Sequence, residues 1–339
     1  MHSNVRTAQP IFLPGFDILR VAAAFAVVYI HGSVSSPKLS NWASWAAFAV
    51  PSFFLMAGFL TARGLAYQAH TDFSPFVRAR VLRLLPAYLA WSAFYLVLRA
   101  FKIGVLQGEG WQAALNINWL TLLLFGGYTY HLWFIPTLLY FSILLYLILC
   151  LIKKLNWIFR FTILTTLAIF IFFLYGYFLN IVEAKPGVSN YLTRYFSRNF
   201  GFSIFGAALF ILLDNCIKWR FIAIVVAVIT WIGVILLAMN FYTVETDVLW
   251  LPCITLGMFM VILLIKQSGT GLHSRLANVS FGIYLVHAVF LETFKLTLNL
   301  FHIPLTAYVT SGLIVLAFVA SGIFSLTLEK NSKMQWLVR

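Results

Sequence analysis

Three ionisable side chains interrupt the first long apolar stretch of the chain: Asp17, Arg20 and His31. A charged side chain near the middle of a bilayer costs at least ~2.5 kcal/mol on insertion scales, so each of the three needs a partner or a function. In a helix, the eleven steps from Arg20 to His31 return to within about 20° of the same face, about 16 Å further along the axis. That face therefore places a fixed cation near one membrane boundary and a titratable imidazole deep inside.

A structural interpretation accounts for the same three residues. Asp17 lies three residues before Arg20, at the spacing of an ion pair on one helix face. A buried histidine bonded to a backbone carbonyl and an arginine extended toward the interface need no catalytic role. The spacing alone leaves both interpretations open.

Three arginines, Arg78, Arg80 and Arg83, lie at the start of the third apolar stretch, shortly before Pro86. Arg80 and Arg83 are three residues apart and share a helix face. Guanidinium groups at this spacing suit the oxygens of a phosphate group. Anchoring of the helix by cytoplasmic arginines explains the same pattern, so phosphate binding stays one of two interpretations.

Two further histidines lie in apolar stretches that begin near residues 131 and 278. His131 opens the segment HLWFIP, and His287 follows Tyr284 by three residues. A histidine within the membrane is a candidate for function, whereas Trp133 is more typical of an aromatic belt. Further along the same stretch, Glu292 and Lys295 are spaced to pair with each other.

No spacing typical of a metal site, a phosphate-binding glycine loop or a serine nucleophile elbow occurs in the sequence. The three cysteines all lie in apolar runs, so they are expected to pack as small core residues. We therefore expect no bound metal and no bound cofactor.

The composition excludes a soluble globular protein. Of 339 residues, 62% are hydrophobic and 9% are charged, whereas soluble domains carry about a quarter charged residues. The net charge of +14 is attributed to loops beside anionic lipid rather than to nucleic-acid binding.

Apolar runs long enough to cross a bilayer set the expected architecture, since a span needs about 20 residues. They lie near residues 14–34, 42–62, 82–100, 131–152, 157–180, 199–217, 220–240, 248–266, 278–299 and 305–328. The sequence predicts an all-α, polytopic bundle of about ten transmembrane helices, forming one integral-membrane domain over residues 1–339 with no soluble accessory domain. Residues 119–125 are too few to span and are expected to form an interfacial or re-entrant piece.

The distribution of Lys and Arg predicts the orientation of this bundle. With the N-terminus inside, sixteen Lys and Arg residues fall in cytoplasmic segments and seven in outer segments. This bias places both termini in the cytoplasm. The expected location is the plasma (inner) membrane, crossed several times.

Five sequence blocks, taken together, resemble the membrane-bound acyltransferase-3 family. They are residues 17–31 with their arginine-to-histidine spacing, residues 51–60, residues 80–88, the segment 131–136 and the segment 284–287. The blocks occur in the family's order and extend over nearly the whole chain. Ala57 stands where serine is more usual, and Leu138 stands where many larger members have a carboxylate. The chain is similar to the shorter, stand-alone branch, without the soluble esterase domain that other members append.

The resemblance implies an O-acyltransferase that moves an acyl group, usually acetyl, from cytoplasmic acyl-CoA to a hydroxyl of a cell-envelope glycan or lipid-linked saccharide. By analogy His31 is the catalytic residue, as general base or transient acyl carrier, and Arg20, Arg80 and Arg83 bind the acyl-CoA co-substrate. The supporting residues are then Asp17, His131, Trp133, Tyr284 and His287.

Two other functions fit a bundle of helices with buried polar groups. A transporter or flippase of a lipid-linked sugar is the main alternative, although no inverted halves are visible and the arginine pair lies at one mouth only. A catalytically silent scaffold has no use for Arg20 and His31 on one face. The acceptor sugar, the choice between acetyl and succinyl, and the oligomeric state do not follow from the sequence.

Overall fold

The computed structural model describes residues 14–67, 72–106, 116–126, 131–181, 198–215 and 272–338, together with residues 108, 112 and 255. Every regular element within these residues is helical. The long helices are α1 (Pro14–Ser33), α4 (Ala49–Tyr67), α5 (Phe73–Phe101), α8 (Phe134–Ile152), α9 (Trp157–Ile181), α11 (Arg198–Asn215), α15 (Ser280–Leu300) and α16 (Ala307–Lys330). The short ones are α2 (Pro37–Ser40), α3 (Ala43–Ala46), η1 (Lys102–Leu106), α7 (Trp119–Phe125), α14 (Leu272–Asn278) and η5 (Gln335–Leu337).

The all-α membrane architecture is confirmed at the level of individual helices. In the part of the chain that the structure describes, six helices are long and apolar enough to cross a membrane. The apolar segments Trp157–Ile171 of α9 and Asn199–Asn215 of α11 are shorter than these six spans. The expected spans at 220–240 and 248–266 lie outside the described residues, so the count of ten and the cytoplasmic termini stay predictions.

Two boundaries differ from the sequence-based expectation. The stretch predicted from residue 82 begins at Phe73, because the arginine-rich segment ahead of Pro86 is itself helical. The stretch predicted from residue 42 begins as the single turn α3, and α4 follows from Ala49. Residues 119–125 form the short helix α7, and the Tyr88 and Tyr140 hydroxyls donate to its backbone carbonyls. Its interfacial or re-entrant position stays a prediction.

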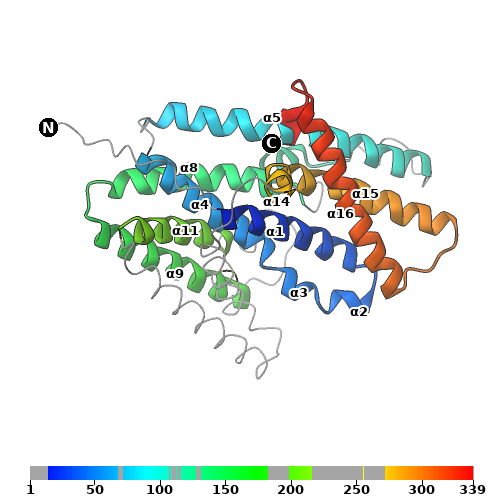
Figure 1. Ribbon diagram of the computed structural model, residues 1–339, viewed down its shortest axis with the longest axis horizontal. Helices are drawn as coiled ribbons and strands as arrows, with labels where there is room; N and C mark the ends of the chain where they lie inside the picture. The colour runs from blue at the N-terminus through cyan, green and yellow to red at the C-terminus, as the bar shows by residue number, and fades with distance from the viewer. Residues whose placement is uncertain are drawn as a thin grey trace.

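Helix α1 lies in the middle of the bundle (Figure 1), in contact with α4, α14, α15 and α16. One of its faces carries Leu19 and Val27 into the large core shared with α4, α5, α8 and α11. The other carries Ala24 and Val28 into a second core shared with α15 and α16. Because α1 is packed on both sides, its polar residues face other helices rather than open lipid.

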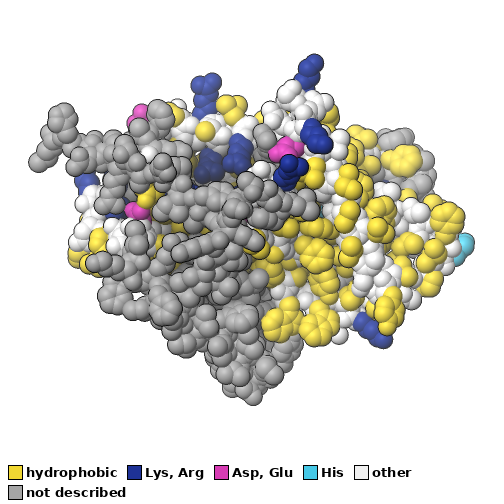
Figure 2. Space-filling model, viewed as in Figure 1, with side chains coloured by type: hydrophobic (Ala, Val, Ile, Leu, Met, Phe, Trp, Pro, Cys, Tyr) yellow, Lys and Arg dark blue, Asp and Glu magenta, His cyan; other side chains and the backbone are white. Residues whose placement is uncertain are grey.

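The outer face of α16 is apolar, as Figure 2 shows along the right-hand part of the molecule. Its exposed residues include Leu316, Val319 and Ile323. Large exposed apolar surfaces are rare on soluble monomers and are ordinary on the lipid side of a membrane helix. Lys and Arg side chains instead gather in the upper half of this view, around α5 and the end of α16.

Helices α4 and α11 approach closely because each presents a glycine to the other. A Cβ added at Gly58 would collide with the backbone carbonyl of Ser203, and one added at Gly206 would collide with that of Leu55. Membrane helices gain packing when small residues let their backbones meet. The second sequence block, residues 51–60, thus contains a residue whose role is the contact with α11.

We expect Gly58→Ala to lower the free energy of unfolding by about 1–3 kcal/mol, since the methyl group overpacks a backbone contact. The matched control is Gly312→Ala on α16, where no atom lies within 4 Å of the added Cβ. Thermal unfolding in detergent measures both variants. Equal melting temperatures for Gly58→Ala and the wild type would contradict the close packing.

Candidate functional site

Three histidines that are far apart in the sequence meet inside the bundle. His31 lies near the end of α1, His131 lies in the turn before α8, and His287 lies on α15. The His31 and His287 rings are stacked, with centroids 5.4 Å apart and an interplanar angle of 22°. The His131 ring meets His287 edge-on at 5.1 Å. His287 is therefore the central member of the cluster.

The three rings differ in accessibility. His131 and His287 are 1% and 0% exposed, whereas His31 is half-buried. Among the three, His31 is thus the one that is not fully buried. This difference fits the catalytic role that the resemblance implies for His31.

The tautomer of His287 follows from its backbone contact. Its Nδ1 lies 2.5 Å from the carbonyl oxygen of Tyr284, which only accepts hydrogen bonds, so Nδ1 carries the hydrogen. Nε2 then has a lone pair, and within the described residues it has no hydrogen-bond partner. A wholly buried acceptor without a donor is costly unless a ligand supplies one.

Two tyrosines fix the surroundings of His131. The Tyr95 ring meets His131 edge-on with centroids 5.0 Å apart, and its hydroxyl donates to the carbonyl of Leu285 at 2.6 Å. The Tyr284 hydroxyl donates to the backbone carbonyl of His131. Both tyrosines are buried, so α5, α15 and the turn before α8 are joined at the cluster.

Sequence reasoning missed Tyr95. The signal was present in the helical period of α5, where Leu84, Tyr88, Trp91 and Tyr95 recur on one buried side. Trp133, interpreted as a boundary aromatic, packs against Phe54 and Phe134 at the edge of the core.

The histidine cluster is not a metal site as it stands. In the part of the chain that the structure describes, no group of three His, Cys, Asp or Glu side chains is arranged to hold a metal ion. The chemistry of the cluster is accordingly that of imidazole nitrogens, which accept and donate protons or attack a carbonyl carbon.

The arginines lie together, nearer the start of α1. Arg20 pairs with Asp17 at 3.6 Å, as the spacing predicts. Arg80 donates to the Thr61 hydroxyl at 3.3 Å and lies 5.3 Å from the centre of the Phe76 ring. Arg83 is within electrostatic range of both other arginines.

Arg83 borders two cavities. One, of about 350 Å³, lies between α4 and α5 and is also lined by Arg80 and Thr61. The other, of about 560 Å³, lies between α5 and the C-terminal segment. Such volumes are in the range of small-molecule sites. Since Arg20 precedes His31 by about 16 Å along α1, the arginines and the histidines mark two ends of one helix.

The expected pair of Glu292 and Lys295 is wrong. Glu292 instead lies 3.6 Å from Lys102, just beyond the end of α5. The local spacing was suitable, but the packing of α15 near the end of α5 supplies a different cation.

Comparison with known proteins decides the assignment. A family profile described as an acyltransferase domain matches residues 13–328, nearly the whole chain. The chain belongs to the acyltransferase-3 family. No curated protein and no solved structure shows a significant match. Membership of the acyltransferase-3 family implies acyl transfer by a membrane protein. The histidine cluster and the arginines both lie within the matched residues.

The difference in exposure predicts the order of chemical modification. Diethyl pyrocarbonate is expected to modify His31 before His131 and His287, because only His31 of the three is not fully buried. Mass spectrometry of peptides after short reaction times measures the order, with His31→Gln as the control for peptide assignment. Modification of His287 as early as His31 would contradict the buried cluster.

Proposed function

We propose that this protein is an O-acyltransferase that moves an acetyl group from cytoplasmic acetyl-CoA to a hydroxyl of a cell-envelope glycan or lipid-linked sugar. The observation that supports it best is the half-buried His31 ring, stacked on the buried His287 ring at the far end of the helix that carries Arg20. Family membership favours this enzyme over a transporter of a lipid-linked sugar.

The donor binds at the arginine end of the bundle. Guanidinium groups bind phosphate oxygens through paired hydrogen bonds, and acetyl-CoA carries three phosphate groups on its nucleotide. Arg83 borders both cavities, and Arg80 lines one of them. The excess of Lys and Arg in this part of the sequence supports a cytoplasmic location for the donor site.

His31 acts as a general base on the acceptor. Its neutral ring takes the proton of the acceptor hydroxyl while the hydroxyl oxygen attacks the thioester carbonyl carbon, which forms the new C–O bond. Collapse of the tetrahedral intermediate breaks the C–S bond. The CoA thiolate then takes the proton back from the imidazolium, so the products are the ester and free CoA.

His287 positions this reaction. Its Nδ1 hydrogen is engaged by the Tyr284 carbonyl, so Nε2 is held as an acceptor for a hydrogen bond from a group that enters the cluster. The stacked ring also restricts the rotation of His31.

A covalent route through His31 is the second form of the mechanism. In it an imidazole nitrogen attacks the thioester, CoA leaves, and the acceptor hydroxyl then takes the acetyl group from the acyl-imidazole. This route separates the donor step from the acceptor step, which suits an acceptor on the other side of the membrane.

The central experiment measures CoA release from labelled acetyl-CoA by the protein in native membrane vesicles, which supply the acceptor hydroxyl that the general-base route needs. His31→Ala should keep membrane insertion and the melting temperature but lose about 10²–10⁴-fold in turnover, the usual contribution of a general base. Near wild-type release by the folded variant would exclude His31 as the catalytic residue. A second measurement incubates each purified protein with labelled acetyl-CoA in the absence of acceptor. If the wild-type protein retains the acetyl label and His31→Ala does not, the covalent route is correct and the general-base route is wrong.

A second experiment tests the donor site. Arg83→Ala is expected to raise the KM for acetyl-CoA about tenfold with little change in kcat, because a charge-assisted hydrogen bond to phosphate is lost. Arg78→Ala is the matched control, since Arg78 lies on the same helix and lines neither cavity. An effect of Arg83→Ala on the acceptor KM alone would overturn the donor assignment.

A further inference from the structure

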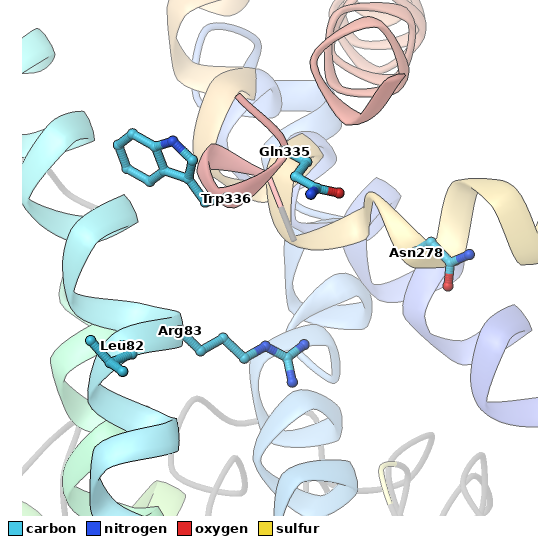
Figure 3. A pocket seen from close by; sticks show the side chains of 5 residues that line it. All are labelled: Leu82, Arg83, Asn278, Gln335 and Trp336. Atoms are coloured by element: carbon cyan, nitrogen blue, oxygen red, sulfur yellow. The ribbon is translucent and has the colours of Figure 1, made fainter. Parts of the chain in front are cut away.

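The larger cavity beside Arg83 is built from three segments that are distant in the sequence. Its volume is about 560 Å³, and its walls are Leu82 and Arg83 of α5, Asn278 of α14, and Gln335 and Trp336 of η5. Figure 3 shows Trp336 and Gln335 above the Arg83 side chain, with Asn278 to the right of the same opening. Neither the family assignment nor the histidine chemistry gives a role to the wall that Gln335 and Trp336 form.

The C-terminal segment that forms this wall is fixed by packing. The Trp91 indole donates to the carbonyl of Leu337 at 3.0 Å, and Val338 is fully buried. Gly282 of α15 has no side chain at this point, and a Cβ there would lie 2.6 Å from Cβ of Val338. The segment is thus docked between α5 and α15, and these contacts fix its position along both helices.

Trp336 is nevertheless presented to the cavity rather than to the core. It is 45% exposed, and its indole nitrogen donates to the carbonyl of Lys333 at 2.9 Å, which restrains the side chain. An aromatic surface that is both restrained and open is suited to stacking by a flat ligand. Stacking of a base on an aromatic side chain does not depend on which base is present.

The other walls supply the remaining requirements of a nucleotide. The amides of Asn278 and Gln335 offer both donors and acceptors, which match the edge of a purine. The Arg83 guanidinium suits a phosphate group, and Arg20 is within electrostatic range of it. Exposed Lys330 and Lys333 add positive charge at the end of α16 and the start of this segment.

We propose that this cavity binds the adenosine 3′,5′-diphosphate portion of acyl-CoA, with the adenine stacked on Trp336 and a phosphate group on Arg83. The inference rests on the proposed function, because the donor is what carries this nucleotide. It adds a specificity element, the C-terminal segment, that selects CoA over shorter thioesters. The acyl-bearing arm then extends along α1 and α5 toward the histidines.

The test compares donors with and without the nucleotide. Trp336→Ala is expected to raise the KM for acetyl-CoA and the Kd for 3′,5′-ADP about tenfold each, while the KM for acetyl-pantetheine stays unchanged. Trp336→Phe should retain most of the affinity, since it keeps an aromatic ring. Trp42→Ala is the matched control, because Trp42 is also exposed and lies beyond the opposite end of α1.

Each outcome bears on the nucleotide site separately from the proposed function. Unchanged affinity of the folded Trp336→Ala protein for 3′,5′-ADP, in a preparation whose wild type releases CoA, would overturn the inference and leave the proposed function intact. Wild-type protein that binds 3′,5′-ADP through Trp336 but releases no CoA would support the site and count against the proposed function. If Trp336→Ala changes only the retention of phosphatidylglycerol, the cavity holds a lipid headgroup and the inference is wrong.

Discussion

The burial of imidazole groups in an apolar bundle is the constraint on which the rest of this structure depends. A polar ring in such surroundings is costly unless its nitrogens find partners. Here the Tyr284 carbonyl accepts the Nδ1 hydrogen of His287, and the other two rings pack against His287. The helices that carry these groups therefore have to meet at one place, which brings α1, α15 and the start of α8 together.

Helix α5 connects this place to the cation-rich end of the bundle. Arg83 borders the cavities, Trp91 holds the C-terminal segment, and Tyr95 lies against His131. Because the three residues follow one another along a single helix, the spacing between the arginine end and the histidine end is set by the rigid helical rise. Helix α5 therefore positions Arg83 at the arginine end of the bundle and Tyr95 at the histidine end.

Relations within one helix were predictable from the sequence where no neighbouring helix supplied a competing partner, and relations between helices were not. The pairing of Asp17 with Arg20 follows from their three-residue spacing. The pairing of Glu292 with Lys102 does not, because it depends on where α15 lies relative to the end of α5. In the same way, periodicity placed His31 on a polar face of α1, but the partner of that face, His287, is fixed by tertiary packing alone. The role of residues 335–338 was also missed, since four residues are too few to show a period that predicts their docking against Gly282.

The close contact between Gly282 and Val338 has a consequence for how the two ends communicate. Gly282 and His287 are five residues apart on α15, which corresponds to about 7.5 Å along the axis. If a molecule that stabilises the docked C-terminal segment also fixes α15, it stabilises the position of the His287 ring, on which His31 stacks. By thermodynamic reciprocity, a group bound among the histidines would then stabilise the docked segment to the same extent. Gly282, which has no reactive side chain, would then couple the free energies of binding at the two ends of the bundle.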